Sequence, residues 1–244
     1  STQGVSSAAS DVYKRQPVGE GTITIDTGVY ENFPLPDYAA KMITENYKSY
    51  FIEVEPGLKV HILEVGEGFP VFLMHGNPTS GFLYRKIADK LPQDKVRVIM
   101  PTSIGLGFSS KIPASQHTLS NHIRWINKVL NELQLNEVIY SGQDWGGPIG
   151  MGALSQSPNL LKGAVLLNTV FNAPKEKADL TSMHARVKTP ILGELLVEVI
   201  FNPFEQLGRV QGDPNSWSED VVSIYSKPAV SYTHLRAHET DSYL

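Results

Sequence analysis

Runs of apolar residues alternate with amphipathic segments through the middle of the chain. Three runs are almost wholly apolar, as expected of strands that are covered on both faces, and they occupy residues 69–74, 96–100 and 163–167. Residues 119–133 instead repeat leucine and isoleucine at the spacing of one helix face, and Thr118 is suited to cap that helix. This alternation predicts an α/β fold with a mostly parallel sheet covered by helices on both faces.

The segment before the first of these runs has a different pattern. Residues 50–54 and 59–65 are strand-like and flank Pro56 and Gly57, which predicts a hairpin. Residues 17–48 are predicted to form an extended arm, because two prolines near its middle restrict regular structure.

A strand, a tight turn and a helix are predicted around Asp144. The apolar residues 138–140 lead into the sequence SGQDWGGP, and a run of small residues follows it. Gly142 and Gly146 lie two positions either side of Asp144, which matches the G-x-nucleophile-x-G elbow, a turn so sharp that its central residue is strained. The usual nucleophile there is serine. A carboxylate forms an ester with an alkyl carbon rather than an acyl carbon, which changes the predicted class of reaction.

Polar, glycine-containing segments also follow two of the other predicted strands. MHGNPTS occupies residues 74–80, and PTSIGLGFS occupies residues 101–109. Open α/β sheets place their sites at the carboxyl ends of parallel strands, so we expect both segments to lie beside Asp144.

The alternating pattern stops near residue 170. Helix-like segments at 192–201 and 218–225 are separated by proline and glycine, and no buried strand follows them. We therefore expect a partial core at residues 17–169, a helical cap at residues 170–229, and the last strands of the sheet to be missing.

Both ends of the chain differ from its middle. Residues 1–16 are rich in serine and alanine without a period, and residues 230–244 are polar. Both resemble translated linker or adapter sequence, so we interpret them as foreign, disordered segments and exclude them from the fold. The natural part is then expected to be cut short, with an unpaired sheet edge and poor solubility.

The motifs together resemble those of a known family. HGNPTS at residues 75–80 and DWGG at residues 144–147 are similar to the haloalkane dehalogenases, a branch of the α/β-hydrolase superfamily, and the resemblance covers roughly residues 30 to 229. It implies that Asp144 attacks the halogen-bearing carbon and forms a covalent alkyl ester. The side chains of Asn77 and Trp145 would hold the leaving halide, and their backbone N–H groups would form the oxyanion hole while a His-activated water hydrolyses the ester.

The sequence departs from this family at the base and its acid partner. The resemblance places the histidine beyond the cap, where His234 and His238 fall inside the tail that we interpret as foreign. Asn168 and its neighbours offer no carboxylate after the strand that precedes the cap. We therefore expect neither base nor acid in the natural segment. Thr102 stands where the family commonly has aspartate. We interpret that aspartate as structural, so we expect the difference to affect the geometry of the loop more than the chemistry.

The remaining histidines have less specific interpretations. His75 is expected to be structural, because it lies on the wrong strand for the family's base. His61, His117 and His122 are assigned by default to the surface or the core, and His184 has no evident partner in the cap.

Three functions stay open. The first is hydrolytic dehalogenation through Asp144. The second is epoxide hydrolysis, which uses the same elbow aspartate and an H-G-x-P loop but needs cap tyrosines, of which the natural segment has one, Tyr225. The third is a non-catalytic fragment that binds apolar ligands or halide without turnover.

The composition of the chain argues against several classes of binding partner. The chain has 21 Lys and Arg against 25 Asp and Glu, a net charge of −4, which gives no electrostatic case for nucleic acid or an anionic membrane. It has no cysteine, which excludes thiolate metal sites, and no apolar run near the ~20 residues of a membrane helix. We expect a cytoplasmic protein without cofactor or metal, whose partners are a small apolar halogenated substrate, water and halide.

Overall fold

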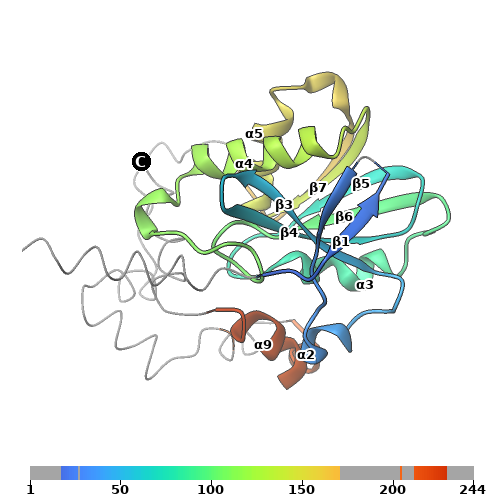
Figure 1. Cartoon of the computed structure of the whole chain (residues 1–244), viewed down its shortest axis with the longest axis vertical. Coiled ribbons are helices and arrows are strands. Elements are labelled where there is room, and N and C mark those ends of the chain that lie inside the picture. The colour runs from blue at the N-terminus through green and yellow to red at the C-terminus, as the bar shows by residue number, and fades with distance from the viewer. Residues whose placement is uncertain (1–17, 27, 171–203, 205–211, 230–244) are drawn as a thin grey trace, which may run out of the picture.

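The computed structural model describes residues 18–26, 28–170, 204 and 212–229 (Figure 1). Within these residues one eight-stranded sheet has the order β1-β2-β3-β4-β6-β5-β7-β8. Its strands are β1 (Thr22–Ile25), β2 (Gly28–Asn32), β3 (Lys48–Glu55), β4 (Leu58–Val65), β5 (Phe69–Met74), β6 (Val96–Pro101), β7 (Val138–Gln143) and β8 (Leu161–Leu167). The α-helices are α2 (Asp37–Ala40), α3 (Arg85–Ala88), α4 (Leu119–Glu132), α5 (Gly146–Leu154) and α9 (Glu219–Ser226).

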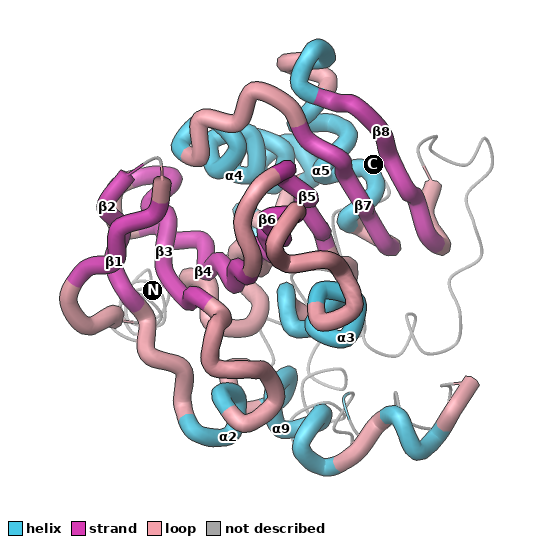
Figure 2. The backbone as a smooth tube through the Cα atoms, turned by 90° about the vertical axis from the view of Figure 1, so that its right-hand side faces the viewer, coloured by secondary structure: helices cyan, strands magenta, loops and turns pink. Residues whose placement is uncertain are grey.

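The sheet joins a parallel half to an antiparallel half. Strands β6, β5, β7 and β8 pair in parallel, as the alternation of strand and helix predicts. Strands β1 to β4 are antiparallel, and β4 joins them to β6. Helices α4 and α5 cover one face of the sheet and α3 lies on the other, while α2 and α9 lie side by side although they are far apart in the sequence (Figures 1 and 2).

Strand β5 illustrates how the two faces are filled. Phe72 and Met74 belong to a core cluster on the side of α4 and α5, whereas Val71 and Leu73 belong to a second cluster on the opposite side. Successive side chains of a strand point to opposite faces, so a strand buried on both must be apolar throughout. The prediction for residues 69–74 is confirmed.

The hairpin and the capped helix are also confirmed. Strands β3 and β4 pair across a turn in which Gly57 has a φ of 75°. Thr118 caps α4, because its Oγ1 accepts a hydrogen bond of 3.2 Å from the backbone N–H of Asn121. The cap side chain supplies an acceptor that the first turn of a helix lacks.

The predicted extended arm at residues 17–48 is wrong. Strands β1 and β2 form an antiparallel hairpin, and β2 pairs with β3. Ile25 is buried in the main core, and the ring of Tyr30 packs on Tyr50, with a 5.3 Å separation of ring centroids. Prolines 34 and 36 restrict only the short link after β2, so they do not prevent these strands from forming.

A buried ion pair links β4 to β6. Arg97 donates two hydrogen bonds to the Glu64 carboxylate, from Nε to Oε1 at 3.0 Å and from an Nη to Oε2 at 2.9 Å. Tyr50 donates a third, of 2.6 Å, to Oε2. Both charged side chains are almost completely buried, so each supplies the counter-charge that water cannot supply there.

The outer part of the sheet carries exposed apolar side chains. Among the described strands β8 is the last of the sheet. The register pairs Ser141 with Val165 and Gln143 with Leu167, so Ile139, Val165 and Leu167 share one face, where they are 40%, 53% and 40% exposed. This trio is called the β8 face. Leu166, on the opposite face of the strand, is also 37% exposed, so the interpretation of residues 163–167 as a strand covered on both faces is wrong for the described part of the chain.

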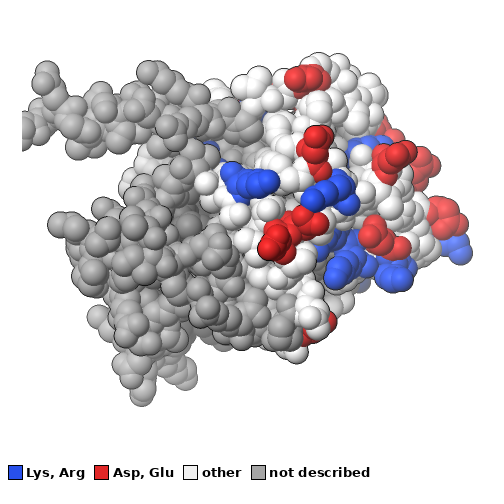
Figure 3. Space-filling view, turned by 90° about the horizontal axis from the view of Figure 1, so that it is seen from below, with Lys and Arg blue, Asp and Glu red and all other residues white. Residues whose placement is uncertain are grey.

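Other expectations lie partly or wholly outside the described residues. These are the two terminal segments, 1–16 and 230–244, and most of the predicted cap, of which α9 matches the helix expected at residues 218–225. None of the described helices is both long and apolar enough to cross a membrane. Figure 3 shows acidic and basic side chains interspersed on one face of the described part.

Candidate active site

Asp144 lies at the turn between β7 and α5 in a strained backbone conformation. Its φ is 53°, a left-handed value that L-residues other than glycine adopt at a cost of about 1–2 kcal/mol. Hydrogen bonds hold this conformation on both sides. Asp144 donates its N–H to the carbonyl of Leu167 at 3.2 Å, and its carbonyl accepts from the backbone N–H of Gly147 at 3.0 Å and from the Thr169 hydroxyl at 2.6 Å. The turn therefore has the strain expected of a nucleophile elbow.

The flanking glycines are required by close backbone contacts. A β-carbon on Gly146 would overlap the carbonyl of Met74, the last residue of β5. A β-carbon on Gly142 would come within 2.9 Å of the backbone of Gly146. The start of α5 thus approaches both β7 and β5 too closely for a side chain at either position.

The loop after β5 contacts the Asp144 carboxylate directly. The backbone N–H of Asn77 donates a hydrogen bond of 3.0 Å to Asp144 Oδ1. Gly76 also faces this carboxylate, since a β-carbon there would overlap the Asp144 side chain. Asp144 is half-buried, and no ion pair among the described residues involves it. Its carboxylate is therefore available for chemistry.

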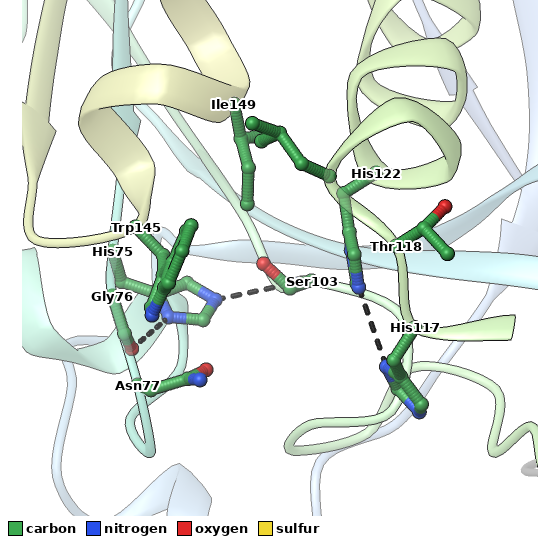
Figure 4. Close-up of a pocket in the computed structure, with 10 residues that line it drawn as sticks. His75, Gly76, Asn77, Ser103, His117, Thr118, His122, Trp145 and Ile149 are labelled. Atoms are coloured by element: carbon green, nitrogen blue, oxygen red, sulfur yellow. Dashed lines mark hydrogen bonds between the residues drawn. The ribbon is translucent and has the colours of Figure 1, made fainter. Parts of the chain in front are cut away.

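A pocket with about 390 Å³ of empty space, partly continuous with solvent, lies beside the elbow (Figure 4). Asp144 is not among the residues that line the pocket, but Trp145, which follows it in the chain, and Asn77, which donates a hydrogen bond to it, both line the pocket. The lining residues come from the ends of β5 and β6, the start of α4 and the start of α5: His75, Gly76, Asn77, Ser103, His117, Thr118, Leu119, His122, Trp145 and Ile149. Asn77 and Trp145, which were predicted as halide donors, are thus brought together on one wall.

His75 joins the two loops that form the base of the pocket. Its Nε2 accepts a hydrogen bond of 3.0 Å from the backbone N–H of Ser103, so its Nδ1 carries the proton and donates to the carbonyl of Gly76 at 2.8 Å. Burial lowers the pKa of His75 to about 4, although the bond to Gly76 acts in the opposite direction. A neutral imidazole with both nitrogens engaged has the structural role that the sequence predicts.

His117 and His122 form a pair that sequence reasoning did not place at the site. His117 Nδ1 and His122 Nε2 are 3.3 Å apart, and the rings stack with centroids separated by 5.4 Å. Burial, and then the neighbouring His75, lower the pKa of His122 to about 4. The available signal was the four-residue spacing of Thr118 and His122, which places both on one face at the start of α4.

Thr102 is an ordered part of the loop after β6. Its Oγ1 accepts the backbone N–H of Gly81 at 3.1 Å, and its carbonyl accepts the hydroxyl of Ser109 at 2.6 Å. The threonine side chain and backbone therefore connect this loop to the segment after β5.

No described residue can be assigned as the catalytic base or as its acid partner. Asn168 follows β8 with a φ of 45°, and neither it nor its chain neighbours Leu167 and Thr169 carries a carboxylate. His234, His238 and His184 lie outside the described residues. Within the described part, no cluster of three or more His, Asp or Glu side chains is arranged to hold a metal ion.

Tyr225 does not line the pocket. It is buried on the other side of the sheet, where its ring stacks on Trp217 with centroids 5.5 Å apart. Burial raises the pKa of Tyr225 to about 12. A phenol packed in this way is not positioned to protonate a ligand in the pocket.

Comparison with known proteins identifies similar sequences and folds. A family model described as the alpha/beta hydrolase fold matches residues 70–205. Haloalkane dehalogenase 2 of Mycobacterium tuberculosis is 37% identical over 113 residues, which cover 46% of this chain and 39% of that protein. The cis-3-alkyl-4-alkyloxetan-2-one decarboxylase of Shewanella oneidensis is 34% identical over 170 residues, which cover 68% of this chain and 52% of that protein. The chain thus spans about half or less of the length of these curated relatives.

Solved structures agree with this comparison. The haloalkane dehalogenase DatA from Agrobacterium tumefaciens C58 has a TM-score of 0.65 at 25% identity, over 81% of this chain and 68% of DatA. The epoxide hydrolase CorEH has a TM-score of 0.64 at 19% identity, over 80% of this chain and 74% of CorEH, which shows a shared fold alone.

Proposed function

The chain belongs to the α/β-hydrolase fold family, and we propose that within this family it serves hydrolytic dehalogenation of haloalkanes through a covalent alkyl ester on Asp144. This proposal rests on the identity of the elbow residue, an aspartate, and on the groups that surround it. Asp144 has a left-handed backbone and a carboxylate next to Asn77, with Trp145 following it in the chain.

In the first step a carboxylate oxygen of Asp144 attacks the carbon that bears the halogen. The new C–O bond forms as the carbon–halogen bond breaks, and the halide leaves with the bonding electron pair. Oδ1 already accepts the Asn77 N–H, which leaves Oδ2 as the attacking oxygen. The side chains of Asn77 and Trp145 offer uncharged N–H donors to the departing halide from the pocket wall.

In the second step water attacks the Asp144 carbonyl carbon of the ester. The negative charge develops on Oδ1, where the Asn77 N–H is directed. The alcohol then leaves with a proton, and the carboxylate is regenerated. This step needs a base to take a proton from water, and none of the described imidazoles is bonded to Asp144. We therefore expect the ester to accumulate on this chain.

Epoxide hydrolysis is the weaker candidate. It would use the same nucleophile and the same loop, His75 to Pro78, but it also needs an acid for the epoxide oxygen. Tyr225 is packed against Trp217 outside the pocket, which disfavours this reaction.

The test is intact-protein mass spectrometry after incubation with 1-bromobutane. We expect the mass of one butyl group to be added, localised by peptide mapping to Asp144, with one equivalent of bromide released. The Asp144→Asn variant is the matched control, because asparagine has the same shape and tolerates a positive φ. It should remain unmodified. An unmodified wild-type chain with a cooperative unfolding transition would contradict the proposal, and diol formation from styrene oxide would favour the second candidate.

A further inference from the structure

The segment at the end of β8 forms hydrogen bonds with both backbone polar groups of Asp144. Strands β7 and β8 pair in parallel as far as Gln143 and Leu167, and they lie side by side in Figure 2. Directly beyond this pairing, Asp144 donates its N–H to the carbonyl of Leu167 at 3.2 Å. The carbonyl of Asp144 accepts a hydrogen bond of 2.6 Å from the Thr169 hydroxyl. One short segment therefore holds the residue at the elbow from its two ends.

The residue between these two contacts has a strained backbone of its own. Asn168 has a φ of 45°, left-handed like the φ of 53° at Asp144, and the two residues follow adjacent strands. Strain of this kind persists only where the surrounding contacts over-determine the conformation. Because the bonds of Leu167 and Thr169 join the two turns, each turn restricts the other.

The side chain of Thr169 fits closely against the first turn of α5. A β-carbon on Gly147 would overlap the Thr169 hydroxyl and would come within 2.7 Å of its methyl carbon. Glycine at position 147 therefore leaves the space from which this hydroxyl reaches the Asp144 carbonyl. The same carbonyl accepts the Gly147 N–H at 3.0 Å, so it lies between two donors.

We propose that Thr169 is a positioning residue for the nucleophile, whose hydroxyl fixes the Asp144 carbonyl and thereby the left-handed backbone that directs the carboxylate to Asn77. The carboxylate is closely surrounded there, because Oδ1 accepts the Asn77 N–H at 3.0 Å and Gly76 lies against the side chain. A change of φ at Asp144 would move the carboxylate away from Asn77. The consequence for alkylation rests on the proposed function, whereas the consequence for the backbone does not.

Two replacements separate the hydroxyl from the space that it fills. Thr169→Val nearly keeps the size of the side chain and removes the donor, whereas Thr169→Ser keeps the donor. Ser155→Ala is the matched control, because the Ser155 hydroxyl makes the same kind of bond, to the Gly152 carbonyl at 2.7 Å, at the other end of α5.

The first measurement is hydrogen exchange of the Asn77 backbone N–H, followed by NMR on the full chain, which needs no reaction. We expect exchange at least tenfold faster in Thr169→Val, and exchange as in wild type for Thr169→Ser and Ser155→Ala. The amides of β3 and β4 are the internal reference, since β6 and β5 separate these strands from β7. They should exchange equally in all variants. Unchanged exchange at Asn77 in Thr169→Val, or equal acceleration in β3 and β4, would overturn the proposal.

The second measurement is the rate of alkylation by 1-bromobutane, followed by intact-protein mass spectrometry. A small misplacement of a reacting group can cost on the order of 100-fold in rate. Thr169 does not line the pocket, so Thr169→Val should lower the limiting rate at least tenfold and leave the half-saturating concentration unchanged. Thr169→Ser should restore the rate.

The two measurements distinguish this proposal from the proposed function. A wild-type chain that is not alkylated would contradict the proposed function alone, and hydrogen exchange at Asn77 would still decide the role of Thr169. A wild-type chain that is alkylated no faster than Thr169→Val would overturn the positioning role.

Discussion

The carbonyl of Met74 occupies the space that a β-carbon on Gly146 would need. Strand β5 and the start of α5 therefore touch backbone to backbone directly beneath the elbow. Asn77 follows β5 and Asp144 precedes α5, so this contact holds close together the two loops that share the 3.0 Å hydrogen bond from Asn77 to Asp144.

Gly146→Ala is expected to destabilise the protein by about 1–3 kcal/mol, because the methyl group forces β5 and α5 apart. The free energy of unfolding in urea measures this change. Gly163→Ala on β8 is the control, since a β-carbon there meets no atom within 4 Å. It should be neutral or slightly stabilising. Equal free energies of unfolding for the two variants would show that the close contact between Met74 and Gly146 does not restrict the residue at position 146.

Glu64→Gln is expected to cost about 3–5 kcal/mol, because it leaves the buried guanidinium of Arg97 without a counter-charge. The same urea unfolding experiment measures it. Lys41→Ala is the comparison, because Lys41 and Asp220 form an ion pair whose side chains are 52% and 51% exposed. Its loss should change stability by less than about 1 kcal/mol. A small effect of Glu64→Gln would mean that water reaches Arg97.

Stability is expected to fall as the pH decreases below 6.5. Burial lowers the pKa values of His75 and His122 to about 4, and burial followed by the charge of Lys111 lowers that of His61 to about 3. Between about pH 6.5 and 4 the unfolded chain binds these protons and the folded chain does not, so each group contributes up to about 1.4 kcal/mol per pH unit. Urea unfolding at pH 7.5, 6 and 5 checks this slope.

His61→Gln should reduce that slope by one group, because glutamine does not titrate and can still reach the Ser49 hydroxyl that His61 bonds at 2.9 Å. A slope that does not differ between this variant and wild type would mean that His61 is already charged in the folded chain.

Val165→Lys is expected to reduce self-association, because it places a charge in the middle of the β8 face. Sedimentation velocity at increasing protein concentration measures this. Val29→Lys on β2 is the control, since Val29 is 65% exposed but distant from that face in the sheet order. A wild-type chain that remains monomeric at all concentrations would contradict the expectation of poor solubility.

The elbow could be predicted from the sequence because its determinants are local. Gly142, Asp144 and Gly146 lie within five residues, and the strand and helix around them have clear apolar patterns. The contact between Asn77 and Asp144 was also predictable, because parallel strands bring their carboxyl ends to one edge of the sheet.

The imidazole pair and the first hairpin were not predictable in the same way. His117 precedes α4 in a loop without a period, and only the folded position of that loop brings it to His122 and the pocket. Strands β1 and β2 have four and five residues, too few for a distinct alternation, and β2 is fixed by its non-local pairing with β3.

The left-handed backbone of Asp144 sets a condition for laboratory evolution of this protein. Glycine adopts that conformation without penalty, so a library selected for thermal resistance alone would accept glycine at position 144 and discard the carboxylate that we propose as the nucleophile. Selection schemes for hardier variants must therefore score alkylation and heat survival in the same round.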